Sequence, residues 1–138
     1  MAIKQLSVFL PNKPGELASF FEFLMDNKIF IRSLTVAETE EYGLLLLLVD
    51  KPEKCALLLE ENNYIFSVTK VIAVRLNNNI SDLYKIAKLL GSNKINIEYL
   101  YFLILDGSIN GVVLKLNDIE GGANVLKKNG FTVIETFD

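Results

Sequence analysis

The 138-residue sequence matches itself at a displacement of 66 residues, and this internal repeat constrains the fold more than any other feature. The matched positions are apolar residues that coincide with apolar residues, together with a few identities, and no gap is needed. They include Leu6 with Ile72, Val8 with Val74, Leu17 with Leu83, Phe20 with Ile86, Leu24 with Leu90, Ile31 with Ile97, Leu34 with Leu100, residues 46–48 with 112–114, and the identical pairs Asn12/Asn78, Lys28/Lys94 and Asn63/Asn129. Chance apolar matches are frequent in a chain that is 51% hydrophobic, but a continuous register over both halves is not. We therefore expect two copies of one unit, residues 1–69 and 70–138, that meet near residues 68–71.

Both copies show the same order of secondary structure, judged from apolar periodicity and turn residues. The expected elements of the first copy are strands at residues 3–10, 29–38, 42–49 and 64–68, helices at 14–27 and 52–62, and a polar turn at 39–41. Those of the second copy are strands at 71–76, 95–105, from 109 and from 131, helices at 81–90 (ended by Gly91) and from 118, and a turn at Asp106-Gly107. This order predicts an α+β fold of two ferredoxin-like βαββαβ units in tandem, each an antiparallel sheet with its helices on one face.

Two of the expected strands are apolar throughout instead of alternating. Residues 44–49 and 99–105 carry apolar side chains at successive positions, so both faces of each sheet need cover. The helices cover one face, and another sheet or chain has to cover the other. Because large exposed apolar patches are rare on monomers, we expect a homodimer.

Composition excludes several classes of function. The chain has no histidine and one cysteine, which leaves no Ser-His or Cys-His nucleophile pair, no thiolate metal cluster and no disulfide within the chain. Cys55 falls in a helical stretch and is expected to be a packing residue. A net charge of −3 without a basic block disfavours nucleic acid. The longest apolar run is six residues, against the roughly 18 of a membrane helix, and the N-terminus lacks the features of a signal peptide. We expect a cytoplasmic, non-enzymatic protein without metal or cofactor.

The loop Asn12-Lys13-Pro14-Gly15-Glu16-Leu17, between the first expected strand and helix, has the chemistry of a ligand site. A helix N-terminus offers unpaired N–H groups and the positive end of the helix dipole to a carboxylate. Gly15 has no Cβ, so a ligand can approach the backbone, and Asn12 supplies both donors and an acceptor. The same residues are also ordinary helix-start chemistry, with Asn12 as a cap and Pro14 at the first helical position. Both interpretations stay open at this point.

This loop resembles that of the ACT domain, a regulatory amino-acid-binding module in which a strand is followed by Asn or Asp, then x-Pro-Gly-x-Leu, a helix, and Ile-Asn-Ile. The first copy keeps Pro14-Gly15, and the second keeps Ile95-Asn96-Ile97. The resemblance implies an amino-acid site formed by Asn12, Pro14, Gly15, Glu16 and Leu17, with Asn96 and Ile97 contributed by a neighbouring domain. Alternatively, Asn96 is a solvated strand residue. The second loop has Asn78 and Ser81 but Ile80-Ser81 in place of Pro-Gly, so we expect it to bind more weakly or not at all.

The resemblance covers the whole chain and is closest to free-standing tandem ACT proteins. It implies a non-catalytic sensor that binds a small amino acid and regulates a partner metabolic enzyme. The alternative is an assembly module that docks on an enzyme through its apolar sheet face and binds no metabolite. A thermal-shift screen against the twenty amino acids separates these two hypotheses.

Overall fold

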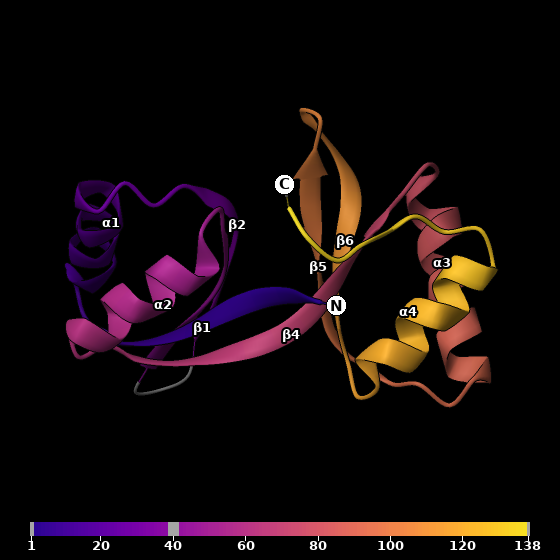
Figure 1. Cartoon of the computed structure of the whole chain (residues 1–138), viewed down its shortest axis with the longest axis horizontal. Helices are drawn as coiled ribbons and strands as arrows, with labels where there is room; N and C mark the ends of the chain where they lie inside the picture. The colour runs from indigo at the N-terminus through magenta and orange to yellow at the C-terminus, as the bar shows by residue number, and fades with distance from the viewer. Residues whose placement is uncertain (1, 39–41, 138) are drawn as a thin grey trace. The chain divides into compact units, whose positions relative to one another are not determined.

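The computed structural model of the chain describes residues 2–38 and 42–137, so the expected turn at residues 39–41 lies outside the described residues. The chain forms two compact units, Lys4–Thr69 and Lys70–Asp138, the latter together with Met1–Ile3. Each is an α+β unit whose two helices lie on one face of an antiparallel sheet (Figure 1). The prediction of two βαββαβ units is confirmed.

The first unit has the strand order β2-β3-β1-β4. Its elements are β1 (Ile3–Pro11), α1 (Glu16–Asp26), β2 (Ile31–Glu38), β3 (Tyr42–Val49), α2 (Pro52–Glu61) and the first part of β4 (Ile65–Arg75). Alternate residues of β1 and β3 pair across the sheet, Leu6 with Leu47 and Val8 with Leu45, and pack against Phe20 of α1. Cys55 of α2 lies in this core, and burial, followed by the Asp50 carboxylate, raises the pKa of its thiol to about 11. Cys55 is therefore the packing residue that the sequence predicts.

The second unit has the equivalent strand order β7-β4-β6-β5. Its elements are the remainder of β4, α3 (Asn79–Ser92), β5 (Ile97–Leu105), β6 (Ser108–Leu116), α4 (Ile119–Lys128) and β7 (Val133–Ile134). Ile72 of β4 pairs with Leu114 of β6, and both pack against Ile86 of α3 and Leu126 of α4. The two units thus bury the same kind of core at equivalent positions.

The two strands expected at residues 64–68 and 71–76 are one continuous strand, β4. Its N-terminal part is the neighbour of β1, whereas residues Ile72 to Arg75 pair with β6. The interruption expected here was wrong because the sequence Val68-Thr69-Lys70-Val71 contains no glycine, proline or asparagine to end a strand, and β-branched residues favour extended backbone.

Two helix boundaries also differ from those expected. Helix α1 begins at Glu16, two residues after Pro14, because Gly15 adopts the left-handed conformation (φ 89°) and is the N-cap. Helix α3 does not end at Gly91. It continues to Ser92, and the chain turns at Lys94, whose φ is 59°.

The repeat is not free of gaps in three dimensions. Leu6 and Ile72 are 66 residues apart, but their partners Leu47 and Leu114 are 67 residues apart. The register of the β5–β6 hairpin shifts between Leu103 and Ile104, which accommodates the additional residue. From there on, equivalent positions differ by 67: it is Asn62, not Asn63, that corresponds to Asn129, and each donates its side-chain amide to the carbonyl four residues earlier at 2.8 Å.

The edge strands β2 and β5 leave equivalent apolar side chains exposed. Leu34 and Val36 of β2 pair with Leu47 and Leu45 on the helix side of the first sheet, yet they are 37% and 45% exposed. Leu100 and Phe102, the equivalent residues of β5, are exposed as well. By contrast, Leu48 and Val113 point away from the helices and are fully buried. Both faces of these inner strands are therefore covered, as the absence of alternation predicts.

Candidate functional site

A cavity of about 210 Å³ lies at the junction of β1 and α1 in the first unit. All five loop residues named from the sequence line this cavity: Asn12, Pro14, Gly15, Glu16 and Leu17. The remaining lining residues are Leu10, Pro11 and Lys13 beside the loop, Val36 of β2, and Gly43 and Leu45 of β3. The fold thus gathers the predicted residues around one small space.

The loop leaves the first backbone N–H groups of α1 free for a ligand. A turn is closed by the Lys13 N–H, which donates to the Pro11 carbonyl at 2.9 Å, and the Glu16 N–H donates to the Lys13 carbonyl at 3.3 Å. The helical ladder starts only where the Ser19 N–H donates to the Gly15 carbonyl at 3.0 Å. Within residues 2–38 and 42–137, the N–H groups of Leu17 and Ala18 have no acceptor. These two groups can bind a carboxylate oxygen at the positive end of the helix dipole.

Asn12 does not cap the helix. The N-cap position belongs to Gly15, no side chain caps this terminus, and Pro14 precedes the cap instead of occupying the first helical position. The Asn12 side chain is exposed and forms no hydrogen bond among the described residues. The helix-capping interpretation of Asn12 and Pro14 is therefore wrong.

One wall of the cavity is apolar and comes from residues that the sequence analysis did not single out. Leu10 and Leu45 are buried, whereas Val36 is half exposed and closes the side of the cavity nearest the edge strand. Val36 lies directly opposite Leu45 in the β2–β3 pairing. The signal that could have found it is the register of this hairpin, because a residue opposite a loop-proximal position of β3 has to lie beside the loop.

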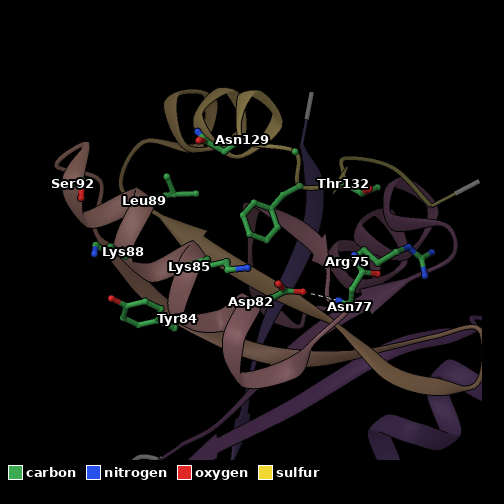
Figure 2. A pocket seen from close by; sticks show the side chains of 12 residues that line it. Arg75, Asn77, Asp82, Tyr84, Lys85, Lys88, Leu89, Ser92, Asn129 and Thr132 are labelled. Atoms are coloured by element: carbon green, nitrogen blue, oxygen red, sulfur yellow. Dashed lines mark hydrogen bonds between the residues drawn. The ribbon is translucent and has the colours of Figure 1, made fainter.

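In the second unit, the chain supplies its own carboxylate to the equivalent loop. Asp82 accepts hydrogen bonds from the backbone N–H groups of Asn77 (2.7 Å) and Asn78 (2.9 Å), and Figure 2 shows its carboxylate turned toward Asn77. The pKa of the Asp82 carboxyl is lowered because the backbone N–H groups of Asn78 and then Asn77 stabilise its charged form. Glu16, its counterpart in the first unit, forms no such bond to the described backbone.

Neither predicted residue of the second loop lines the cavity that the structure shows in this unit. The Asn78 N–H is bound by Asp82, and its carbonyl accepts from the Asp82 N–H at 2.8 Å. Asn78 and Ser81 both lie outside the lining of that cavity.

Asn96 and Ile97 lie at the far end of the second sheet from their own loop. Ile97 pairs with Leu116, whereas Arg75, next to the loop, pairs with Gly111 at the other end of β6. The Asn96 N–H donates to Asn117 Oδ1 at 2.9 Å, and its carbonyl accepts from the Asn117 N–H at 3.2 Å. A contribution of Asn96 and Ile97 to a ligand held by Asn12 and Gly15 stays a prediction.

Comparison with known families decides the classification. The profile of the ACT domain pair matches residues 1–137, nearly the whole chain. The chain belongs to the ACT domain pair family. A search of curated proteins gives no match.

Solved structures share this ACT domain pair. A protein of Bacteroides thetaiotaomicron superposes with a TM-score of 0.89 at 29% identity, over 97% of this chain and 92% of that one. The regulatory subunit of aspartate kinase from Thermus thermophilus superposes with a TM-score of 0.63 at 16% identity, over 91% and 89%. Its counterpart from Thermus flavus gives the same TM-score at 13% identity, over 93% and 92%. None of the helices described for this ACT domain pair has the length and apolar character to cross a membrane.

Proposed function

We propose that this ACT domain pair is a cytoplasmic, non-enzymatic sensor that binds one small amino acid in the first unit and modulates a partner metabolic enzyme. The observation that carries the proposal is the cavity beside Gly15, where free helix N–H groups meet an apolar wall. Family membership supports a regulatory role.

Each part of an α-amino acid has a partner in this cavity. The carboxylate accepts from the N–H groups of Leu17 and Ala18, the ammonium group faces the Glu16 carboxylate and the Asn12 carbonyl oxygen, and the side chain packs on Val36 and Leu45. A volume of about 210 Å³ equals that of about seven water molecules. We therefore expect a small aliphatic amino acid to bind better than an aromatic one.

The first experiment is a thermal-shift screen of the whole chain against the twenty amino acids. A ligand that binds only the folded state raises the melting temperature in proportion to its saturation. We expect a small aliphatic amino acid to raise it, and calorimetry then gives the affinity. If none of the twenty shifts the transition, the sensor proposal is wrong and the assembly-module alternative gains support.

Replacing Asn12 by alanine should weaken binding of that amino acid about tenfold, which is the loss of roughly one charge-assisted hydrogen bond. Calorimetry on Asn12→Ala and on the matched variant Asn78→Ala measures the difference, and we expect Asn78→Ala to stay within about twofold of wild type. Asn12 is a cleaner probe than Gly15, because Gly15→Val blocks the ligand but also strains a backbone with φ 89°. An affinity that ignores Asn12 and collapses with Asn78 would show that the two loops were assigned the wrong way round.

We also propose that the chain forms a homodimer. The exposed apolar residues of the edge strands, Leu34 and Val36 of β2 with Leu100 and Phe102 of β5, give a second chain or a partner enzyme an apolar surface to cover. Light scattering at micromolar concentration should give about twice the 15.5 kDa mass of one chain, and a stable interface buries at least ~1,000 Å². A monomer mass under these conditions would contradict the proposal.

A further inference from the structure

The second unit contains a cleft of about 530 Å³ between α3 and residues 129–132, the segment that follows α4. Figure 2 shows Lys85 and Lys88 along α3 on one side, Asn129 and Thr132 on the other, and Arg75 near Asn77. The volume lies in the range of sites for small organic ligands. This cleft is separate from the amino-acid cavity of the first unit, so it can be tested independently.

The cleft is cationic although the chain as a whole is acidic. Lys85 and Lys88 are three residues apart on α3 and therefore share one face of the helix. Neither forms an ion pair with a carboxylate in the part of the chain that the structure describes, and the Lys88 Nζ lies 5.7 Å from the centre of the Tyr84 ring. Arg75 adds a third cation, shared with the exposed Asp106 at 3.3 Å. The lining carboxylate of Asp82 is already bound to backbone N–H groups.

The first unit shows that the fold alone does not require this charge. The positions that correspond to Lys85 and Lys88 are occupied by Ser19 and Glu22 on α1. The position of Ser92, at the end of the same helix face, is Asp26. The same surface is therefore acidic in one unit and basic in the other.

The first unit also shows how this space is filled when it is not used. Phe23 corresponds to Leu89, and Tyr64 corresponds to Phe131, since each of the latter two donates its N–H to an equivalent leucine carbonyl. The rings of Phe23 and Tyr64 lie 5.0 Å apart and pack on each other. In the second unit, the shorter Leu89 leaves this volume open, and the opening coincides with the lysines.

We propose that this cleft binds the phosphate monoester of a small organic molecule. The phosphate lies between the ammonium groups of Lys85 and Lys88, and the organic part packs against Leu89 and Phe131. A phosphate monoester carries about −1.5 to −2 charges at neutral pH, which matches two point charges, whereas lysine lacks the planar fork that favours carboxylate. Ser92, Asn129 and Thr132 supply further hydrogen-bond donors along the cleft.

Calorimetry on the full chain with glycerol phosphate, inorganic phosphate and succinate tests the charge. We expect glycerol phosphate to bind most tightly and K85Q/K88Q to weaken it about tenfold. The matched control K51Q/K128Q removes two exposed lysines outside the cleft and should leave the affinity unchanged. Equal binding of succinate, equal loss in the control, or no heat from glycerol phosphate up to about 10 mM would overturn the proposal.

The variant Leu89→Phe tests the cavity separately from its charge. It copies the residue of the first unit, keeps both lysines, and should abolish binding because the larger ring fills the space against Phe131. Undiminished binding to folded Leu89→Phe would show that the lysines attract phosphate on an open surface, and the proposed site would be wrong. If this variant does not fold by circular dichroism, the comparison of K85Q/K88Q with K51Q/K128Q decides.

Discussion

Replacing Phe20 by alanine should lower the free energy of unfolding of the first unit by about 3–5 kcal/mol, the largest effect we expect from a single truncation. The Phe20 side chain is fully buried, and its ring contacts those of Phe21, Phe23 and Tyr64 at centre distances of 5.3–6.3 Å. A cavity of this size removes much of the ~5–15 kcal/mol by which a domain is stable. Hydrogen exchange at the core amides of β3 measures the loss within this unit.

The matched control for Phe20→Ala is Phe30→Ala, which removes the same side chain from a position that is 65% exposed. An exposed substitution of this kind should change stability by no more than about 0.5 kcal/mol. If both variants cost the same, the ring cluster around Phe20 does not form the core of the first unit.

Replacing Val36 by aspartate should weaken amino-acid binding about hundredfold while the chain stays folded. Val36 lines the cavity beside the β1–α1 loop, so a carboxylate there meets the apolar side chain of the ligand and repels its carboxylate. Because Val36 is 45% exposed, the unliganded chain can solvate the new charge. Calorimetry with the amino acid found in the thermal-shift screen gives the affinity.

Leu34→Asp is the matched control for this change. Leu34 lies on the same strand and the same face, is 37% exposed, and does not line the cavity. It should therefore bind the ligand like wild type. If Leu34→Asp loses as much affinity as Val36→Asp, the effect comes from the edge strand as a whole, and the ligand does not contact the cavity wall.

The repeat predicts most of the fold because the apolar positions of Leu6, Phe20 and Leu24 recur as Ile72, Ile86 and Leu90, and all six are buried. The turn at Asp106-Gly107 is confirmed as well, since both residues have positive φ, as two-residue hairpin turns require. What the repeat cannot reveal is a shift of one residue between two apolar strands, because Leu46 and Leu47 match Val113 equally well. Only the pairing Ile72–Leu114 fixes the register.

The loop residues of the site were predictable because Pro14-Gly15 marks a special backbone in the sequence itself. Val36 was not, since its place beside the loop depends on pairing with Leu45 across a hairpin. The role of Asp82 was equally hidden: an acidic residue in the first turn of a helix is ordinary, and only the geometry shows that it binds two N–H groups of its own loop.

The Asp82 carboxylate also sets how steeply a single chain can respond to an amino acid. Two open loops per chain would allow one occupied loop to change the affinity of the other. With the second loop closed by its own side chain, one chain takes up one ligand, and its dose–response curve is hyperbolic. A Hill coefficient above one would then have to arise between chains, and it would fall as the protein is diluted below its association constant. The duplication thus yields a graded detector with one variable half and one constant half.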